Sequence, residues 1–456
     1  MDHRLRPGQR IPSTRALASE LGVSRFPVLN AYAQLLAEGY FESRVGAGTE
    51  ISRSLTDQFP ASERNAGEAA THSGARPLAQ RASTVPVMRS APWRRGVGPF
   101  GVGQVAFDQF PLQAWSQIAG RYCRGMDASS SHYGDVMGDP TLRETIATYL
   151  RTARSLHCEA QQVLIVAGSQ QALEITARVL LDPGNHVWME EPGYDLARDV
   201  FTFAGCRLVP VPVDGEGLNV TAGVRMYRKA RAAFVTPSHQ FPLGVVMTAS
   251  RRFQLLEWAQ ATGAWIIEDD YDSEYRYESM PITSLQGMDA NARVIYVGTF
   301  SKVLFPALRL GYVVVPLDLV EPFRTVRRAM DLGPPTLYQQ VLAEFIAEGH
   351  FARHIRRMRG LHRERRDELV KNLRRELGPR VQLLGGEAGL HLTITLPDGV
   401  REFEVAERAA RHNLRLWPLA SYYMGKGAAP GFVLGFGSTR VKEIGPAVRK
   451  LRNLLG

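Results

Sequence analysis

A lysine stands directly after an apolar run in the second half of the chain. Apolar residues at 294–297 are typical of a buried strand, and after this run come Thr299, Ser301 and Lys302. Because a second apolar run follows, we expect Lys302 to lose water, which favours its neutral amine and makes it a nucleophile toward carbonyls. Arg309 and the hydroxyls nearby suit a phosphate. A carbonyl beside a phosphate is the chemistry of pyridoxal 5'-phosphate, so the segment predicts a site for that cofactor.

An alternation of strands and helices would position these groups. Apolar runs predict strands at 163–166, 186–189, 232–236, 264–268 and 294–297. Helical patterns, such as those at 170–181 and 251–262, lie between most of these runs. The alternation predicts an α/β fold with a mostly parallel sheet and flanking helices. The C-terminal ends of parallel strands meet at one edge of such a sheet.

Groups with useful chemistry follow several of the predicted strands. In chain order they are Gly168, Ser169 and Gln170, which open a helix, then Tyr194, then Asp269 and Tyr271. Backbone N–H groups at a helix start can bind an anion. Each feature has a plain alternative: a helix cap, a packed turn residue, a solvated acidic loop or an exposed loop lysine. Together, in this order and with Lys302 last, they predict a single cofactor site.

The first fifty residues follow a different pattern. The pattern predicts a short helix at residues 13–21 and a turn at Gly22. It then predicts a second helix at residues 24–38, followed by a hairpin with a glycine-rich tip at residues 40–51. This order is typical of a winged helix-turn-helix that binds DNA. The alternative is a small helical pair of another kind. A net charge of +10 permits nucleic-acid binding without demonstrating it.

Several motifs in this region are specific. They are Pro7-Gly8-Gln9-Arg10-Ile11-Pro12-Ser13-Thr14-Arg15, Val23-Ser24-Arg25, Glu38-Gly39-Tyr40 and Gly46-Ala47-Gly48-Thr49. Together they resemble the DNA-binding domain of the GntR family. The resemblance implies that phosphates or base edges are contacted by Arg15, Ser24, Arg25, Arg44, Gly46, Gly48 and Thr49. GntR domains carry another helix before the Pro-Gly segment, so we expect a truncated head or a start further upstream. Phe26-Pro27 replaces polar residues of the family and is expected to alter base preference.

The remainder of the chain resembles a second family. Beside the strand ends and the lysine segment, the motifs are Phe107-Asp108-Gln109-Phe110-Pro111, Thr236-Pro237-Ser238-His239-Gln240-Phe241-Pro242 and Glu268-Asp269-Asp270-Tyr271-Asp272. They are similar to fold-type I aminotransferases, and the fusion to a GntR-like head resembles the MocR/GabR regulators. The resemblance implies a fold-type I transferase domain with a small C-terminal α+β subdomain, preceded by a truncated winged helix-turn-helix. The expected boundaries are 1–52 for the head, 53–98 for a flexible linker and 99–456 for the effector domain.

The resemblance also implies a role for each site residue. Lys302 forms the internal aldimine, Asp269 pairs with the pyridine nitrogen, and Tyr271 contacts the phenolic oxygen. Tyr194 stacks on the ring. The phosphate is expected to be held by Gly168, Ser169, Gln170, Thr299, Ser301 and Arg309, with Tyr133 reaching it from the partner subunit. A homodimer is implied, arranged head-to-tail, whose two heads read paired half-sites of double-stranded operator DNA.

Two departures from working aminotransferases bear on function. Those enzymes commonly carry an asparagine where this chain has Phe241, before Pro242. The family's carboxylate-binding arginine near the C-terminus is matched most closely by Ser438, which leaves Arg440 as the candidate effector-binding residue. We therefore expect a transcription regulator that senses an amine or amino-acid effector through aldimine exchange at Lys302, without efficient turnover. The alternative is a catalytic aminotransferase with a vestigial DNA-binding head.

Composition limits the remaining possibilities. Residues 53–98 are rich in Ala, Ser, Arg, Pro and Gly, as expected of a flexible linker. The chain has no apolar run long enough for a membrane span and no signal-peptide pattern at its start. Its three cysteines lie far apart and lack the spacing of a metal site. We expect a cytoplasmic protein with reduced thiols and no metal.

Overall fold

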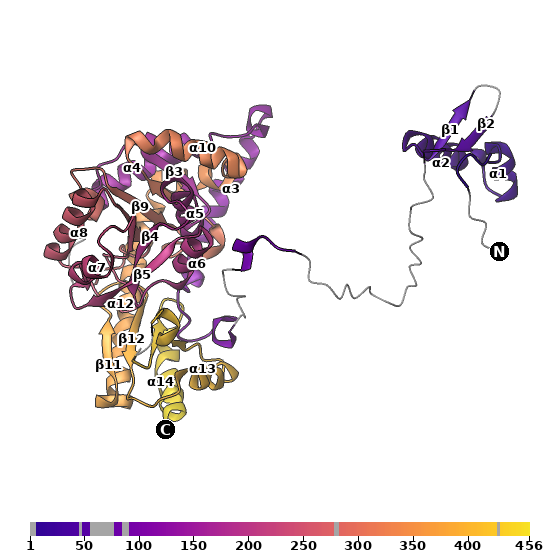
Figure 1. Cartoon of the computed structure of the whole chain (residues 1–456). Coiled ribbons are helices and arrows are strands. Elements are labelled where there is room, and N and C mark those ends of the chain that lie inside the picture. Colours follow the sequence, from indigo (N-terminus) through magenta and orange to yellow (C-terminus); the bar gives the residue numbers. More distant parts are fainter. Residues whose placement is uncertain (1–5, 45–47, 55–76, 84–90, 278–281, 426–428) are drawn as a thin grey trace. The chain divides into compact units, whose positions relative to one another are not determined.

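The computed structural model describes residues 6–44, 48–54, 77–83, 91–277, 282–425 and 429–456. Contacts divide the chain into two compact units, Met1–Pro77 and Leu78–Gly456, and Figure 1 shows both. They are called the N-terminal unit and the large unit below.

The N-terminal unit contains two helices and a hairpin. α1 (Thr14–Glu20) and α2 (Arg25–Ala37) precede the antiparallel strands β1 (Phe41–Arg44) and β2 (Gly48–Ile51). The Ser13 hydroxyl accepts a hydrogen bond from the Ala16 N–H, which fixes the start of α1. A small core unites the elements and consists of Ile11, Ala18, Val28, Tyr32 and Ile51. The predicted helix-turn-helix and wing are present, and the tip of the wing at 45–47 lies outside the described residues.

An eight-stranded mixed sheet forms the centre of the large unit. Its strands are β3 (Val163–Val166), β4 (His186–Glu191), β5 (Arg207–Asp214), β6 (Gly217–Leu218), β7 (Ala232–Val235), β8 (Trp265–Asp270), β9 (Val294–Thr299) and β10 (Gly311–Val314). They are ordered β3-β10-β9-β8-β7-β4-β5-β6. The neighbouring pairs from β9 to β5 are parallel, whereas β10 runs antiparallel to both β9 and β3. The five predicted strands are all present.

Helices cover both faces of this sheet. They are α3 (Leu112–Gly125), α4 (Pro140–Arg154), α5 (Ser169–Leu180), α6 (Asp195–Phe203), α7 (Val220–Tyr227), α8 (Ala249–Thr262), α9 (Leu285–Met288), α10 (Val320–Asp331) and α11 (Leu337–Ala347). Successive strand residues enter different cores: Ile165 packs with α4 and α11, and Leu164 packs with α5 and α10. Burial on both faces explains why these strands are continuously apolar.

A smaller subdomain follows the long helix α12 (His350–Leu377). It contains β11 (Gln382–Gly385), β12 (His391–Thr395), α13 (Glu402–Arg411), β13 (Trp417–Pro418), β14 (Gly431–Gly435) and α14 (Val441–Leu455). The four strands form an antiparallel sheet in the order β11-β12-β14-β13. Figure 1 shows this subdomain in yellow and orange, below the large sheet. The expected C-terminal α+β subdomain is thus present.

The last part of the predicted linker belongs to the large unit. This unit begins at Leu78, and a short 3-10 helix covers Pro92–Arg94. Trp93 is buried in the core of the small subdomain, where its ring contacts that of Phe403 at 5.9 Å. A tryptophan is large enough to dock a segment that has no helical or strand periodicity.

None of the described helices combines the length and apolar character needed to cross a membrane. The three cysteines form no disulfide, and Cys158 and Cys206 are buried.

Candidate active site

The loop between β9 and β10 carries the predicted lysine. Thr299 and Gly311 pair across this hairpin, so Lys302 and Arg309 lie on the same loop. Lys302 Nζ donates a hydrogen bond to the Gly103 carbonyl oxygen at 3.4 Å. Burial lowers the pKa of Lys302, against the opposing effect of the nearby Asp272 and Asp269 carboxylates. A lowered pKa favours the neutral amine that can attack a carbonyl carbon.

A pocket around Lys302 brings together the predicted cofactor residues. The predicted residues that line it are Gly168, Ser169, Gln170, Tyr194, Asp269, Tyr271, Thr299, Ser301, Lys302 and Arg309. They follow or end β3, β4, β8 and β9, because the C-terminal ends of these strands share one edge. Tyr133 does not line the pocket and is 86% exposed. Its contribution from a partner subunit stays a prediction.

One end of the pocket has the features of a phosphate site. Gly168 adopts a left-handed φ of 93° immediately before α5, a conformation that favours glycine. A Cβ placed on Gly168 would lie 3.5 Å from Arg309 Nη1, so this glycine leaves room between the helix start and the guanidinium. The Ser301 N–H donates to Thr299 Oγ1 at 3.1 Å. A helix N-terminus with an adjacent arginine favours a dianionic group.

Asp269 supplies a buried carboxylate on the same pocket. Its Oδ1 atom is buried and has no hydrogen-bond partner among the described residues. Burial and the neighbouring Asp270 raise the pKa of Asp269 to about 7. An unpaired buried carboxylate is costly, and a protonated ring nitrogen would satisfy it. Together with Lys302 and the phosphate end, this orphaned oxygen fits pyridoxal phosphate.

Aromatic side chains line the part of the pocket between these groups. The Phe241 ring contacts that of Tyr194 at 5.8 Å and that of Tyr271 at 6.1 Å, both nearly perpendicular. Gln170 Nε2 donates to the Tyr194 hydroxyl at 3.5 Å. The Tyr271 hydroxyl donates to the His239 carbonyl oxygen at 2.8 Å. Phe241 therefore places an apolar ring against both Tyr194 and Tyr271.

The predicted effector arginine lies elsewhere. Arg440 precedes α14, its side chain is 57% exposed, and its nearest anionic partner is Asp108 at 3.8 Å. Among the described pocket-lining residues the arginines are Arg94 and Arg309. Arg94 Nη2 donates a hydrogen bond to the Asp195 carboxylate, and its Cζ lies 5.0 Å from the centre of the Trp417 ring. Sequence reasoning missed Arg94, although the lone Trp93 in a polar segment was a signal that the segment docks.

The N-terminal unit exposes most of the predicted DNA-contacting residues. Arg15, Ser24, Arg25, Arg44 and Gly48 are exposed, Thr49 is half-buried, and Gly46 lies outside the described residues. Arg25 Nε donates to Thr14 Oγ1 at 3.2 Å, which links the two helices. Arg44 is 3.8 Å from Glu50 across the hairpin. DNA contact by these residues stays a prediction.

Comparison with known proteins decides the family. The bacterial regulatory proteins of the gntR family match residues 1–51, and aminotransferase class I and II matches residues 96–442. The chain is 38% identical over 450 residues to the probable rhizopine catabolism regulatory protein MocR of Rhizobium meliloti, covering 98% of this chain and 90% of that protein. It belongs to the MocR/GabR group of GntR-family regulators.

Further similarities support this assignment. This MocR/GabR regulator is 33% identical over 437 residues to the pyridoxine biosynthesis transcriptional regulator PdxR of Corynebacterium glutamicum, covering 95% of this chain and 88% of PdxR. Kynurenine aminotransferase of Pyrococcus horikoshii superposes with a TM-score of 0.76 at 26% identity, covering 83% of this chain and 96% of the enzyme. The predicted family and the predicted fold-type I architecture are both confirmed. Membership of the aminotransferase family implies use of pyridoxal phosphate.

Proposed function

We propose that this transcription regulator binds pyridoxal phosphate at Lys302 and uses it to detect an amine or amino acid, which changes how the heads engage DNA. The observation that carries the proposal is the convergence of Lys302, Asp269 and Arg309 on one pocket in a chain that also has a GntR head. An effector shifts the protein between states only if it binds them unequally. Lys302 would hold the cofactor through its amine, and an effector amine would compete with Lys302 for that place.

Different pocket residues would bind different parts of the cofactor. Lys302 provides the amine, Asp269 would keep the ring nitrogen protonated, and Tyr271 would contact the phenolic oxygen. The start of α5 and Arg309 would hold the phosphate, with Ser301 and Thr299 nearby. Tyr194 would stack on the ring. When bound, the cofactor supplies an aldehyde that condenses reversibly with amines and an electron-withdrawing ring.

Phe241 favours detection over turnover. A phenyl ring cannot donate a hydrogen bond, so the asparagine's donor to the phenolic oxygen is absent from this position. The second candidate function, a catalytic aminotransferase, is favoured by the ten predicted cofactor residues that line one pocket. Assay of the purified protein with amino acids and 2-oxo acids separates the two functions. Sustained conversion would favour the enzyme.

We also propose a homodimer in which Tyr133 reaches the partner's pocket. Its 86% exposure is compatible with contact to another subunit, as the family resemblance implies. Two heads would then read two half-sites of double-stranded DNA. Analytical ultracentrifugation tests the dimer, and a Tyr133→Phe variant with weakened phosphate binding would support the contact.

An absorbance spectrum tests the cofactor directly. The wild-type protein is expected to show a visible band that borohydride abolishes, and Lys302→Ala should lack it. Lys442→Ala changes an exposed lysine of α14 and serves as the matched control. A wild-type spectrum without such a band, even after pyridoxal phosphate is added, contradicts the proposal. Salt-dependent binding to DNA upstream of the coding region tests the regulatory part.

A further inference from the structure

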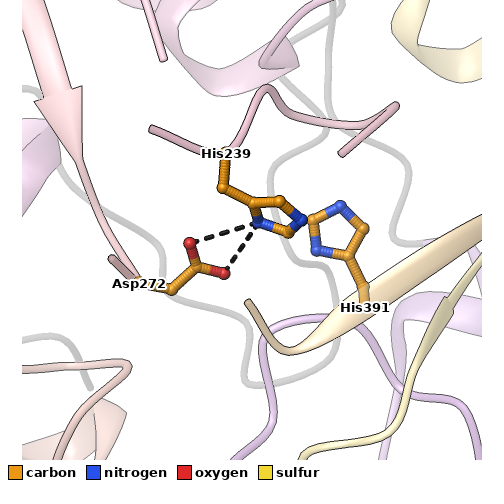
Figure 2. Close-up of side chains that lie close together, drawn as sticks. All are labelled: His239, Asp272 and His391. Atoms are coloured by element: carbon orange, nitrogen blue, oxygen red, sulfur yellow. Dashed lines mark hydrogen bonds and ion pairs between the residues drawn. The ribbon is translucent and has the colours of Figure 1, made fainter. Parts of the chain in front are cut away.

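A buried histidine and a buried aspartate lie directly behind Tyr271. Figure 2 shows the His239 ring pointing its Nδ1 atom at the Asp272 carboxylate. Nδ1 lies 3.2 Å from each Asp272 oxygen and 3.0 Å from the Tyr271 hydroxyl oxygen. His239 and Asp272 are each 1% exposed. The roles assigned so far to the cofactor residues leave this pair without a function.

The contacts determine where the His239 proton lies. An ionised carboxylate only accepts hydrogen bonds, so the atom that faces Asp272 is Nδ1–H. The same N–H approaches the Tyr271 oxygen, which therefore accepts from His239. The Tyr271 proton is directed away from His239 Nδ1, to the His239 carbonyl oxygen at 2.8 Å. A phenolic oxygen in the pocket that Tyr271 lines would offer this hydroxyl a second acceptor. A hydroxyl that accepts a hydrogen bond becomes a stronger donor.

The surroundings hold this pair in place. The Leu390 N–H donates to Asp272 Oδ2 at 3.3 Å. A Cβ on Gly389 would lie 2.2 Å from His239 Nδ1 and 2.4 Å from Asp272 Oδ2, so the absence of a side chain at Gly389 permits the contact. The fold thus brings the segment between β11 and β12 of the small subdomain against two residues that follow β7 and β8 of the large sheet.

His391 covers the other side of the His239 ring. The two rings lie 4.7 Å apart, and His239 Nε2 points toward His391 in Figure 2. His391 Nε2 contacts the Pro242 carbonyl oxygen at 3.2 Å, and a carbonyl accepts, so this nitrogen carries a proton. Burial and the adjacent His239 keep the pKa of His391 well below its ordinary value. His239 Nε2 itself is buried without a hydrogen-bond partner among the described residues.

These contacts suggest a replacement for the missing asparagine. We propose that His239 and Asp272 are a positioning pair that orients the Tyr271 hydroxyl as the donor to the cofactor's phenolic oxygen. The inference rests on the proposed cofactor at Lys302. Phe241 cannot donate a hydrogen bond to that oxygen. Protonation of the phenolic oxygen would then depend on the Tyr271 hydroxyl and on the pair that contacts it. The other titratable groups around the pair are His391, Lys302, Asp269, Arg276, Tyr275 and Tyr277.

A metal ion is the competing explanation for two histidines and an aspartate in one place. One ligand atom from each lies within 4.8 Å of the others. Metal–ligand bonds of about 2.0–2.1 Å hold two ligands at most about 4.2 Å apart, and about 3.4 Å in a tetrahedron. A metal would need all three ligand atoms to meet these distances, and His239 Nδ1 is already engaged by Asp272 and Tyr271.

The pH titration of the visible band in the cofactor-loaded protein tests the pair. A donor to the phenolic oxygen stabilises its anion, so weakening that donor should move the midpoint to higher pH. Asp272→Asn and His239→Leu are each expected to raise the midpoint by about one pH unit, a tenfold change in proton affinity. His239→Asn keeps an N–H near the Nδ1 position and should restore most of the wild-type midpoint. The exposed Asp318→Asn is the control.

Combined variants distinguish positioning from general damage. Tyr271→Phe should raise the midpoint by itself, and adding Asp272→Asn to it should produce no further shift, because the pair acts through the hydroxyl. Additive shifts, or an unchanged midpoint in Asp272→Asn and His239→Leu, overturn the inference while the band itself still supports the cofactor. Treatment with EDTA is expected to leave the midpoint unchanged, and a shift on chelation would favour the metal instead. If the wild-type protein shows no visible band at all, the proposed function fails, and not only the role of this pair.

Discussion

Arg94 donates a hydrogen bond to the Asp195 carboxylate within the wall of the pocket that contains Lys302. Asp195 begins α6, directly after Tyr194. Arg94 stands on the segment that enters the large unit after the predicted linker, next to the buried Trp93. The segment leading toward the DNA-binding head therefore contributes a charged side chain to the proposed effector site.

Arg94 is expected to bind the carboxylate of an amino-acid effector. Its Nε and Nη1 atoms make no hydrogen bond to the described residues, so donors remain beside the bond to Asp195. Arg94→Gln should weaken binding of amine-free probes such as propionate and succinate by about tenfold, because a charge-assisted hydrogen bond is lost. Tryptophan fluorescence of the cofactor-loaded protein reports binding, since Trp417 packs on Arg94. Arg95→Gln is the neighbouring control, and equal affinities for wild type and Arg94→Gln would refute the role.

Arg309 is expected to recognise the phosphate rather than the ring. The Arg309→Gln variant should lose about tenfold or more in affinity for pyridoxal phosphate, because it lacks the charge beside the start of α5. Affinity for pyridoxal, which has no phosphate, should change little. Both affinities follow from titration of the visible band. An equal loss for the two ligands would mean that Arg309 supports the loop and not the phosphate.

Buried histidines should make the large unit sensitive to acid. Burial lowers the pKa of His362 to about 3 and that of His354 to about 4, below the ordinary 6.5. As the pH falls, these histidines bind protons in the unfolded chain before they do so in the folded protein. The free energy of unfolding therefore decreases as the pH falls from 6.5 toward the folded-state pKa values. Between about pH 6 and pH 5, each histidine should reduce the free energy of unfolding by about 1 kcal/mol.

Urea unfolding of the His362→Phe variant measures this effect. The variant should lose about 1 kcal/mol less than wild type over that pH interval, because one titrating group is gone. His412→Phe changes an exposed histidine and should follow the wild type. Parallel pH profiles for His362→Phe and wild type would show that His362 does not control the acid response.

Arg25 is expected to contact DNA from the start of α2. The Arg25→Ala variant should bind DNA more weakly, and the slope of log affinity against log salt should fall by about 0.9 if the contact is to one phosphate. Fluorescence anisotropy at several salt concentrations gives the slope. Arg225→Ala, on the exposed surface of α7, should leave both affinity and slope unchanged. A loss confined to particular base sequences would indicate a base contact for Arg25 instead.

Much of the site was predictable because it depends on topology. Gly168, Asp269 and Lys302 each follow or end a buried strand, and parallel strands bring such residues to one edge regardless of the loops between. The head was predictable from its motifs and its turn residues. The apolar residues of β10 were evident, but they were not predicted to form a strand. A run of four residues does not show whether it forms a strand or which way that strand runs in the sheet.

Other features arise from contacts that no local pattern encodes. Arg94 reaches the pocket because Trp93 docks a segment without periodicity on the small subdomain. His391 meets His239 only after β12 packs beside the loop that follows β7. Arg440 was expected at the site from its place in a motif, whereas the start of α14 leaves its side chain facing solvent. Such placements depend on tertiary packing rather than on sequence spacing.

The docked segment around Trp93 determines where a chimeric protein should be joined. The match to the aminotransferase family begins at residue 96, which is after Arg94. A chimera that joins a foreign DNA-binding head at that boundary would discard Trp93 and Arg94, and with them a charged residue that lines the pocket. A junction placed upstream of Ala91 keeps both residues. The start of the family match and the start of the structural unit that forms the pocket are therefore different positions in this chain.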